Sequence, residues 1–203
     1  MRIAVLLFFW LLTPQVLATE ALTQAELNAL LRGEAVVRVS RDAQSKSVSS
    51  GQGFAAIDIP APPEAVFAAM TDCARAKRYV KNLVSCKVLQ RDPKGAWEVR
   101  ETMVRLSVAL PDFRAVARLD YDRPKQIRFR QTEGSFDYAQ GQWDLMAYRE
   151  GRTTRVFYRV RAGTSIPIPE FLLQNLIETD LPETLKALRA EVLRVAAPVK
   201  RGP

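Results

Sequence analysis

The chain has 203 residues, of which 48% are hydrophobic and 26% charged, and its formal net charge is +8. This length and composition fit one globular domain with a substantial core and exclude a chain of low complexity. The arginines are dispersed along the chain and not gathered into one basic block, which argues against a nucleic-acid binder. Their spread favours either a solvated outer sheet face or attraction to anionic lipid head groups.

The first 18 residues have the pattern of a secretory signal peptide. Arg2 precedes an apolar run over residues 3–12, and Val16 and Ala18 put small residues at the cleavage site. An uncleaved anchor helix is the alternative. The run is shorter than the roughly 20 residues that span a bilayer, which favours a cleaved signal peptide. We expect cleavage after Ala18 and a periplasmic or secreted protein.

Residues 19–45 are expected to form an N-terminal helix and a lead-in segment. The amphipathic stretch Leu22–Arg32 predicts the helix, with Thr23 and Glu26 at a capped start and Gly33 at its end. The main domain is expected over residues 46–197, followed by a disordered tail over 198–203.

The next elements are two strands and two helical segments. Alternating residues predict strands over 35–40 and 46–59. Pro63 suits the first turn of a helix that runs to about Thr71, and a second short helical segment is expected over 74–80.

Cys73 and Cys86 are the two cysteines of the chain. An even cysteine count in an exported protein favours a disulfide, here between the end of a helix and the start of a strand. A metal site or a catalytic thiol is the alternative, but the chain has no histidine and two lone thiolates make a poor zinc site. We therefore expect no metal and no cofactor.

From Val84 onward the chain predicts a meander of antiparallel strands. Turn signals such as Asp92-Pro93-Lys94-Gly95 and Arg123-Pro124 separate the segments, and the spacing does not fit a parallel repeat. The expected strands are Ser85–Arg91, Trp97–Leu110, Phe113–Asp122, Gln126–Glu133, Tyr138–Arg149 and Thr153–Thr164.

The last element is a long helix over Pro169–Ala196. In its second half apolar residues recur in steps of four and three, while charged residues such as Arg189 and Glu191 take the opposite, solvated side. Asp180 and Glu183 form a capping-box pattern around Pro182, so the helix is either kinked there or two helices in tandem. The apolar stripe is Leu181, Leu185, Leu188, Val192 and Val195.

The order of these elements and several short motifs resemble the START-like (SRPBCC) superfamily, and within it the coenzyme Q-binding, polyketide cyclase-type branch. The resemblance covers roughly Val48 to Val195. The matching residues are Ile59-Pro60-Ala61-Pro62-Pro63-Glu64-Ala65-Val66-Phe67, Thr71-Asp72, Tyr79, Glu133-Gly134-Ser135-Phe136, Gly141-Gln142-Trp143 and Leu181-Pro182.

This resemblance implies an α+β helix-grip fold, in which a curved antiparallel sheet wraps around the long C-terminal helix. Members enclose a hydrophobic cavity between the two, bind sterols, phospholipids, quinones or polyketides, and only some are enzymes. A filled core in place of a cavity is the alternative.

Strand alternation and the resemblance together predict which residues line the cavity. Tyr121, Tyr158 and one of Arg105 or Arg159 are candidates for contacts with a polar head group. The full set of predicted ligand-binding residues is Leu106, Val108, Phe113, Tyr121, Phe129, Trp143, Tyr158, Leu173, Ile177, Leu181, Leu185 and Leu188.

Two segments are candidates for the mouth of this cavity, Ile166–Phe171 and the basic stretch Lys77–Lys81. Apolar tips flanked by positive charge would suit docking on an anionic membrane surface. The alternative is a rigid proline-rich turn and a solvated basic helix.

The sequence offers little for an enzyme. Histidine is the commonest general acid or base, and it is absent. Nothing in the strand pattern directs the carboxylates of Glu101, Asp120, Asp137 or Asp144 into a pocket, and they fit exposed partners of the arginines.

We therefore predict a monomer that binds or transports a hydrophobic ligand (a lipid, isoprenoid or quinone) without chemistry and without a nucleic-acid partner. The alternatives are a cyclase or aromatase that uses a buried tyrosine or carboxylate, and an envelope protein-interaction module with a filled core.

Overall fold

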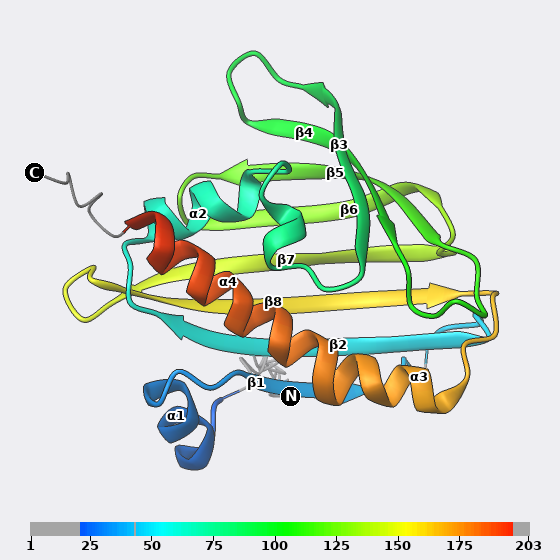
Figure 1. The fold of residues 1–203 in the computed structure, drawn as a ribbon, viewed down its shortest axis with the longest axis horizontal. Helices are drawn as coiled ribbons and strands as arrows, with labels where there is room; N and C mark the ends of the chain where they lie inside the picture. The colour runs from blue at the N-terminus through cyan, green and yellow to red at the C-terminus, as the bar shows by residue number, and fades with distance from the viewer. Residues whose placement is uncertain (1–20, 43, 197–203) are drawn as a thin grey trace, which may run out of the picture.

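The computed structural model describes residues 21–42 and 44–196, so the predicted signal peptide and C-terminal tail lie outside the described residues. Eight strands form one antiparallel sheet in the order β1-β2-β8-β7-β6-β5-β4-β3, and the last helices cross one face of it (Figure 1). This arrangement confirms the α+β helix-grip fold. The strands are β1 (Val36–Ser40), β2 (Ser49–Ile59), β3 (Leu83–Arg91), β4 (Trp97–Val104), β5 (Phe113–Asp122), β6 (Gln126–Gly134), β7 (Tyr138–Tyr148) and β8 (Thr153–Thr164).

The helical elements fall into three groups along the chain. None of the helices described is both long and apolar enough to cross a membrane. They are α1 (Gln24–Leu31), α2 (Pro63–Thr71), the short 3-10 helix η1 (Ala76–Arg78), α3 (Glu170–Asn175), the π-helical turn η2 (Leu176–Asp180) and α4 (Leu181–Ala196).

Helix α1 begins where the sequence predicts it. The Thr23 hydroxyl accepts a hydrogen bond from the Glu26 backbone N–H, and the Glu26 side chain accepts one from the Thr23 backbone N–H. The helix packs Leu30 against Phe54 on the outer face of the sheet. Gly33 then ends the helix region with φ of +79°, a conformation that glycine adopts without strain.

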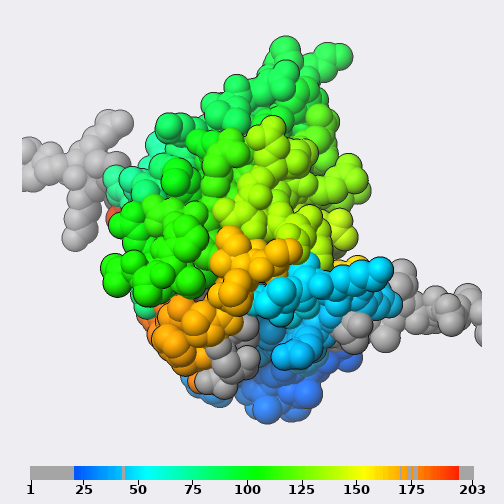
Figure 2. Space-filling model, turned by 90° about the vertical axis from the view of Figure 1, so that its right-hand side faces the viewer, coloured from blue at the N-terminus to red at the C-terminus, as the bar shows by residue number. Residues whose placement is uncertain are grey.

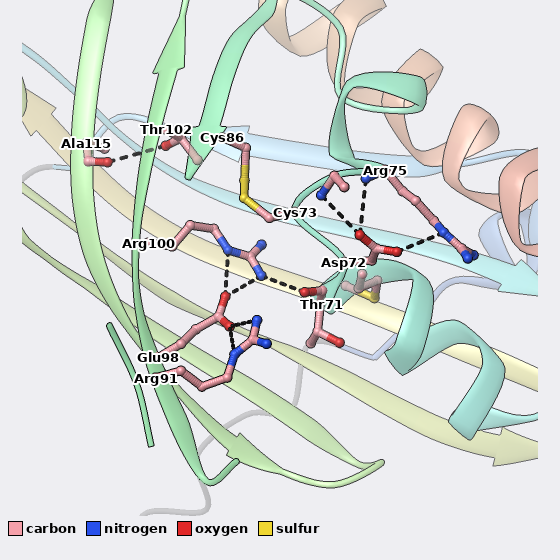
Figure 3. The surroundings of a disulfide bond; sticks show 12 residues. Thr71, Asp72, Cys73, Arg75, Cys86, Arg91, Glu98, Arg100, Thr102 and Ala115 are labelled. Atoms are coloured by element: carbon pink, nitrogen blue, oxygen red, sulfur yellow. Dashed lines mark hydrogen bonds and ion pairs between the residues drawn. A yellow bond between two sulfur atoms is a disulfide. The ribbon is translucent and has the colours of Figure 1, made fainter. Parts of the chain in front are cut away.

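Helix α2 is tied to the sheet by the predicted disulfide. Pro63 occupies its first turn, where the missing N–H costs nothing. The chain turns after Asp72, and Cys73 bonds to Cys86 on β3, which confirms the pairing (Figure 3). The bond therefore links the end of α2 to the outermost strand on this side.

The inner face of the sheet carries the sets predicted by alternation. Residues opposite one another in an antiparallel pair lie on the same face. The register places Tyr158 opposite Trp143, Trp143 opposite Ile127, and Ile127 opposite Tyr121, so these four side chains form one row across β8, β7, β6 and β5.

Strand β4 ends earlier than predicted, at Val104 and not at Leu110. The guanidinium of Arg105 donates two hydrogen bonds of 2.7 Å to the Asp112 carboxylate, which closes residues 105–112 into a loop. Leu106 and Val108 therefore lie in a loop and not on the sheet face, and Val108 is 97% exposed.

The C-terminal helix does not break at Pro182, which lies in the first turn of α4; the irregularity is the π-helical turn η2 just before it, which joins α3 to α4 without a gap. Asp180 at the end of η2 is buried, forms an ion pair with Lys81 and accepts a hydrogen bond from Asn82, which fixes the turn against the segment before β3. The prediction that Glu191 lies on the solvated side of the helix is wrong. Its side chain is buried, with 6% of the residue exposed, and it pairs with Arg194.

The filled core lies between α2, α4 and one half of the inner sheet face. It is built from Leu185, Leu188 and Val192 of the predicted stripe of α4, the apolar face of α2 and the ends of β2, β7 and β8. Val195, the last residue of that predicted stripe, is instead 45% exposed. The largest fully buried side chains of the core are Ile57, Ile59, Val66, Val156, Leu185 and Val192. Strand β3, at the sheet edge, departs from regular pairing with β4 at two points, between Leu83 and Ser85 and between Val88 and Gln90.

Candidate ligand-binding site

The row from Tyr158 to Tyr121 marks the boundary of the filled core. Ile127 in this row is buried in the core, whereas Tyr158, Trp143 and Tyr121 are half-buried and pack against it. The next row consists of Val160, Gly141, Phe129 and Leu119, and all four are half-buried. In the described part of the chain, Phe129 and Val160 belong to neither core cluster.

Three aromatic rings form the floor of this region. Trp143 and Tyr158 stack with their ring centroids 3.9 Å apart, and Phe129 lies parallel to Tyr158 at 6.2 Å. Gly141 makes the arrangement possible, because a Cβ at this position would lie 2.8 Å from the Phe129 ring. The glycine of the Gly-Gln-Trp motif thus lets the ring lie over the backbone.

Tyr158 has two properties that fit a side chain lining an interior space. Burial raises the pKa of its hydroxyl well above the usual range, so many protein atoms surround it. The residue as a whole is nevertheless only half-buried. A half-buried aromatic residue among many protein atoms is typical of the lining of a small-molecule site.

Two buried polar atoms beside this region have no hydrogen-bond partner among the described residues. They are the hydroxyl oxygen of Tyr121 and the side-chain carbonyl oxygen of Gln131. Burial, more than the nearby Glu98 carboxylate, raises the pKa of Tyr121 far above its usual range, so the hydroxyl stays protonated. Each buried polar group of this kind calls for a partner outside the chain, such as an ordered water or a ligand.

Next to Tyr121, a buried ionic cluster connects β3, β4 and α2 (Figure 3). Glu98 is only 1% exposed, and its two oxygens accept hydrogen bonds from Arg91 and Arg100. Arg100 also donates to the backbone carbonyl of Thr71 at 3.0 Å. Because cations are favourable at the end of a helix, this contact holds the C-terminal end of α2 in place.

The structure brings together part of the predicted site. Tyr121, Phe129, Trp143 and Tyr158 lie on the inner face as described, and Phe113 is buried against Phe136 on the same side. Leu185 and Leu188 lie in the filled core, and Leu181 packs against it. The side chains of Leu173 and Ile177 lie outside the described part of the structure.

The two arginines considered for a head group lie elsewhere. Arg105 pairs with Asp112 in the loop after β4, and Arg159 lies on the outer face, where it pairs with Asp144. Gln131 is the residue that our sequence analysis missed. It alternates with Ile127 and Phe129 and so shares their face, but a polar residue gives no signal in a search for apolar stripes.

The carboxylates considered for catalysis make outer-surface contacts. Glu101 pairs with Arg114, Asp120 with Arg118, and Asp144 with Arg159. Asp137 accepts hydrogen bonds from the hydroxyls of Ser47 and Ser165. Over residues 21–42 and 44–196, no three acidic, cysteine or histidine side chains are grouped to hold a metal.

Two surface hollows lie outside the sheet interior. A polar one of about 560 Å³ is lined by the segment before β2 and by the facing ends of β7 and β8, including Asp42, Tyr138 and Arg161. A smaller one of about 270 Å³ lies between Lys77–Lys81 and the first turns of α4, at Glu183, Thr184 and Ala187. The basic segment proposed for the mouth therefore faces α4.

Solved structures of known proteins share this fold. The protein TTHA0849 from Thermus thermophilus is 28% identical over 72% of this chain and 99% of its own, with a TM-score of 0.59. The Zhui aromatase/cyclase from Streptomyces sp. R1128 is 15% identical over 75% of this chain and 99% of its own, with a TM-score of 0.61.

A STAR-related lipid transfer protein from Xanthomonas axonopodis is 18% identical over 79% of this chain and 94% of the solved fragment, with a TM-score of 0.63. No curated protein sequence matches the chain significantly. The family model described as polyketide cyclase / dehydrase and lipid transport matches residues 59–189, which is more than half of the chain. The chain therefore belongs to the polyketide cyclase/dehydrase and lipid transport family.

Proposed function

We propose that this protein binds and carries a hydrophobic ligand on the inner face of its sheet, without chemistry. The observation that carries this proposal is the half-buried aromatic floor of Trp143, Tyr158 and Phe129, which lies beside the filled core and not within it. Apolar surface that is neither packed nor freely exposed is the usual lining of a small-molecule site. A lipid, an isoprenoid or a quinone fits such a lining.

The two tryptophans downstream of the signal segment allow a direct test. Trp143 lies on the aromatic floor, whereas Trp97 packs under Arg118, whose guanidinium carbon is 4.3 Å from the ring centroid. A brominated fatty acid quenches tryptophan fluorescence only on close contact. In Trp97→Phe, which retains Trp143, we expect strong and saturable quenching, and in Trp143→Phe, which retains Trp97, we expect little.

Equal quenching of both variants, or none in either, would contradict the proposal. Native mass spectrometry of protein purified from its host then identifies the ligand class. A lipid, isoprenoid or quinone that leaves with organic extraction is the expected result.

Contact with an anionic membrane surface is the second part of the proposal. At the end of the molecule where α3 begins, the loop 105–112 and the segment before β2 lie on either side of residues 166–171 (Figure 2). This end exposes Val48, Val108 and Phe171, the last 67% exposed. The hollow beside α4 adds the exposed cations of Lys77, Arg78 and Lys81. Apolar tips with nearby positive charge favour binding to acidic lipids.

Vesicle co-sedimentation tests this contact. Binding should be stronger to vesicles with phosphatidylglycerol than to neutral ones, and Val108→Asp should weaken it. Val195→Asp, which changes an exposed residue at the far end of α4, is the matched control. Binding that is unaffected by lipid charge or by Val108→Asp would exclude this surface.

Export is also part of the proposal. A disulfide is compatible with an oxidising compartment, and the signal pattern of residues 1–18 supports secretion. N-terminal sequencing of protein from its host should begin at residue 19.

A cyclase-type activity is the second candidate, because the buried Glu98 lies beside the unpartnered hydroxyl of Tyr121. Both oxygens of Glu98 are bound by arginines, so it is poorly placed to take a proton from a ligand. Conversion of a poly-β-keto thioester by the protein, lost in Tyr121→Phe, would favour this candidate.

A further inference from the structure

Gln131 supplies the first half of an inference about the ligand itself. Its Nε2 donates a 2.7 Å hydrogen bond to the backbone carbonyl of Phe136. Rotating the amide by 180° would bring two oxygens together, so this bond fixes which amide atom is oxygen. The buried Oε1 has no partner in the part of the chain that the structure describes. An amide oxygen can only accept, so its missing partner must be a donor.

Tyr121 supplies the second half. Its ring meets Phe67 of α2 edge to face, at a centroid distance of 5.5 Å. Its buried hydroxyl makes no hydrogen bond of regular geometry within the same described residues. The neighbouring Glu98 carboxylate, which interacts with it, is already bound by Arg91 and Arg100. Because the hydroxyl is protonated, it can donate to a ligand oxygen or accept from a ligand hydroxyl.

The sheet register sets how far apart these two residues lie along the strands. Gln131 lies opposite Ala117 on β5, and Tyr121 lies four residues further along the same strand. Four residues of strand span about 13 Å. Between the two positions lie Leu119 and Phe129, which are directly opposite each other and apolar.

The two ends also differ in their surroundings (Figure 1). Tyr121 lies at the end of the sheet covered by α2, as its contact with Phe67 shows. Gln131 lies beside the hairpin between β6 and β7, at the end where α3 begins and where the loop 105–112 is exposed.

We propose that the ligand is polar at both ends, with an apolar middle over Leu119 and Phe129, a hydroxyl or other donor at Gln131, and a second polar group at Tyr121. This inference rests on the proposed binding function and narrows its ligand to long-chain molecules with a terminal donor, such as a hydroxylated acyl chain or an isoprenoid diol. A simple fatty acid or a plain hydrocarbon meets only one of the two requirements or neither.

Three probes with the same ten-carbon chain separate the contribution of the apolar middle from that of the terminal donor groups. They are decane, the decane diol with a hydroxyl at each end, and the dimethyl ether of that diol. The ether keeps the oxygens but lacks the donor hydrogens. Affinities are measured on delipidated mature protein by displacement of a bound brominated fatty acid, with the recovery of tryptophan fluorescence as the signal.

We expect the wild-type protein to bind the diol about tenfold or more tightly than the dimethyl ether, since a buried acceptor left unpaired is costly. Gln131→Met should reduce this ratio to near one and leave decane binding unchanged, which also shows that the variant is folded. Tyr121→Phe should weaken the diol and spare decane. The matched controls are Gln140→Met and Tyr148→Phe, which alter exposed residues of β7.

The outcomes separate this inference from the function on which it rests. Equal affinity of the wild-type protein for the diol and the dimethyl ether overturns the donor at Gln131, while the binding function stands. A diol preference that survives in Gln131→Met overturns the assignment to this residue. If none of the three probes binds, decane included, the inference and the proposed function both fail.

Discussion

Removal of the disulfide offers a quantitative test of how the fold is held together. The bond joins Cys73 and Cys86, which are 13 residues apart, and links the end of α2 to the edge strand β3. Closing a loop of this length removes chain entropy from the unfolded state worth about 3 kcal/mol at 25 °C. The double variant Cys73→Ala/Cys86→Ala should therefore be less stable than the oxidised protein by about that amount.

Guanidinium chloride unfolding, followed by circular dichroism, measures this loss. With a slope of about 5 kcal/mol per molar denaturant, 3 kcal/mol lowers the midpoint by about 0.6 M. Wild-type protein treated with a reductant is the second arm, and a thiol assay shows when the bond has opened. No other cysteine complicates that assay. A midpoint unchanged by both treatments would refute the reasoning that this bond restrains the unfolded chain.

The remaining predictions concern packing, acid sensitivity and the backbone. Leu188→Ala should lower the free energy of unfolding by about 3 kcal/mol, measured by thermal or denaturant unfolding, because Leu188 is 2% exposed in the core. Val195→Ala, at a site 45% exposed, should lower it by under about 0.5 kcal/mol. Similar losses in the two variants would contradict the assigned helix face. The hydrogen bond from Arg38, more than any other contact, lowers the pKa of Glu26 from 4.5 to about 2, so its contribution to stability is present above pH 4.5 and is lost as the pH falls toward 2. Titration of the Glu26 carboxyl by NMR should show this value, and Arg38→Met should raise it; a pKa near 4.5 in the wild type would be inconsistent with the pair. Gly134→Ala should lower the free energy of unfolding by more than about 2 kcal/mol, because a Cβ would lie 2.1 Å from the Arg114 carbonyl oxygen at φ of +135°. Gly151→Ala, whose Cβ would meet no atom within 4 Å, should lower it by only about 1 kcal/mol. Equal losses would mean that the positive φ alone, and not the steric clash, determines the loss of stability.

Much of the fold follows from local sequence signals. Proline and glycine punctuation located the ends of β5 and β8 as predicted, and alternation placed Tyr121, Trp143 and Tyr158 on one face. These signals succeed because each depends only on neighbours in the chain. The family resemblance supplied the topology that local signals lack, and the shared fold and family match confirm it.

The errors arose where distant residues decide the outcome. Leu106, Val108 and Leu110 continue the alternation of β4, but the ion pair between Arg105 and Asp112 folds them into a loop. Glu191 has the helical position of a solvated residue. It is buried because the cations of Arg194, Arg75 and Arg78 compensate its charge. Arg75 and Arg78 are distant in the chain, so no local sequence pattern predicts their contribution.

The candidate site was predicted only in its apolar part. Tyr158 and Phe129 follow from the strand period, since apolar residues on one face are expected to gather. The role of Gln131 could not be predicted from the sequence. It follows from the hydrogen bond that the Gln131 amide nitrogen donates to the Phe136 carbonyl, which leaves the amide oxygen without a partner among the described residues. The branch that binds coenzyme Q remains a prediction, as do the domain boundaries and the monomeric state.

The irregular outer strand of the sheet has a consequence for how this protein behaves at high concentration. An edge strand with regular, unpaired backbone groups invites a strand from a second molecule to dock alongside it. Here β3 is interrupted twice within nine residues, and it presents the exposed side chains of Lys87 and Arg91. A neighbouring chain would meet broken hydrogen-bond spacing and the charge of Lys87, so this edge of the sheet disfavours self-addition.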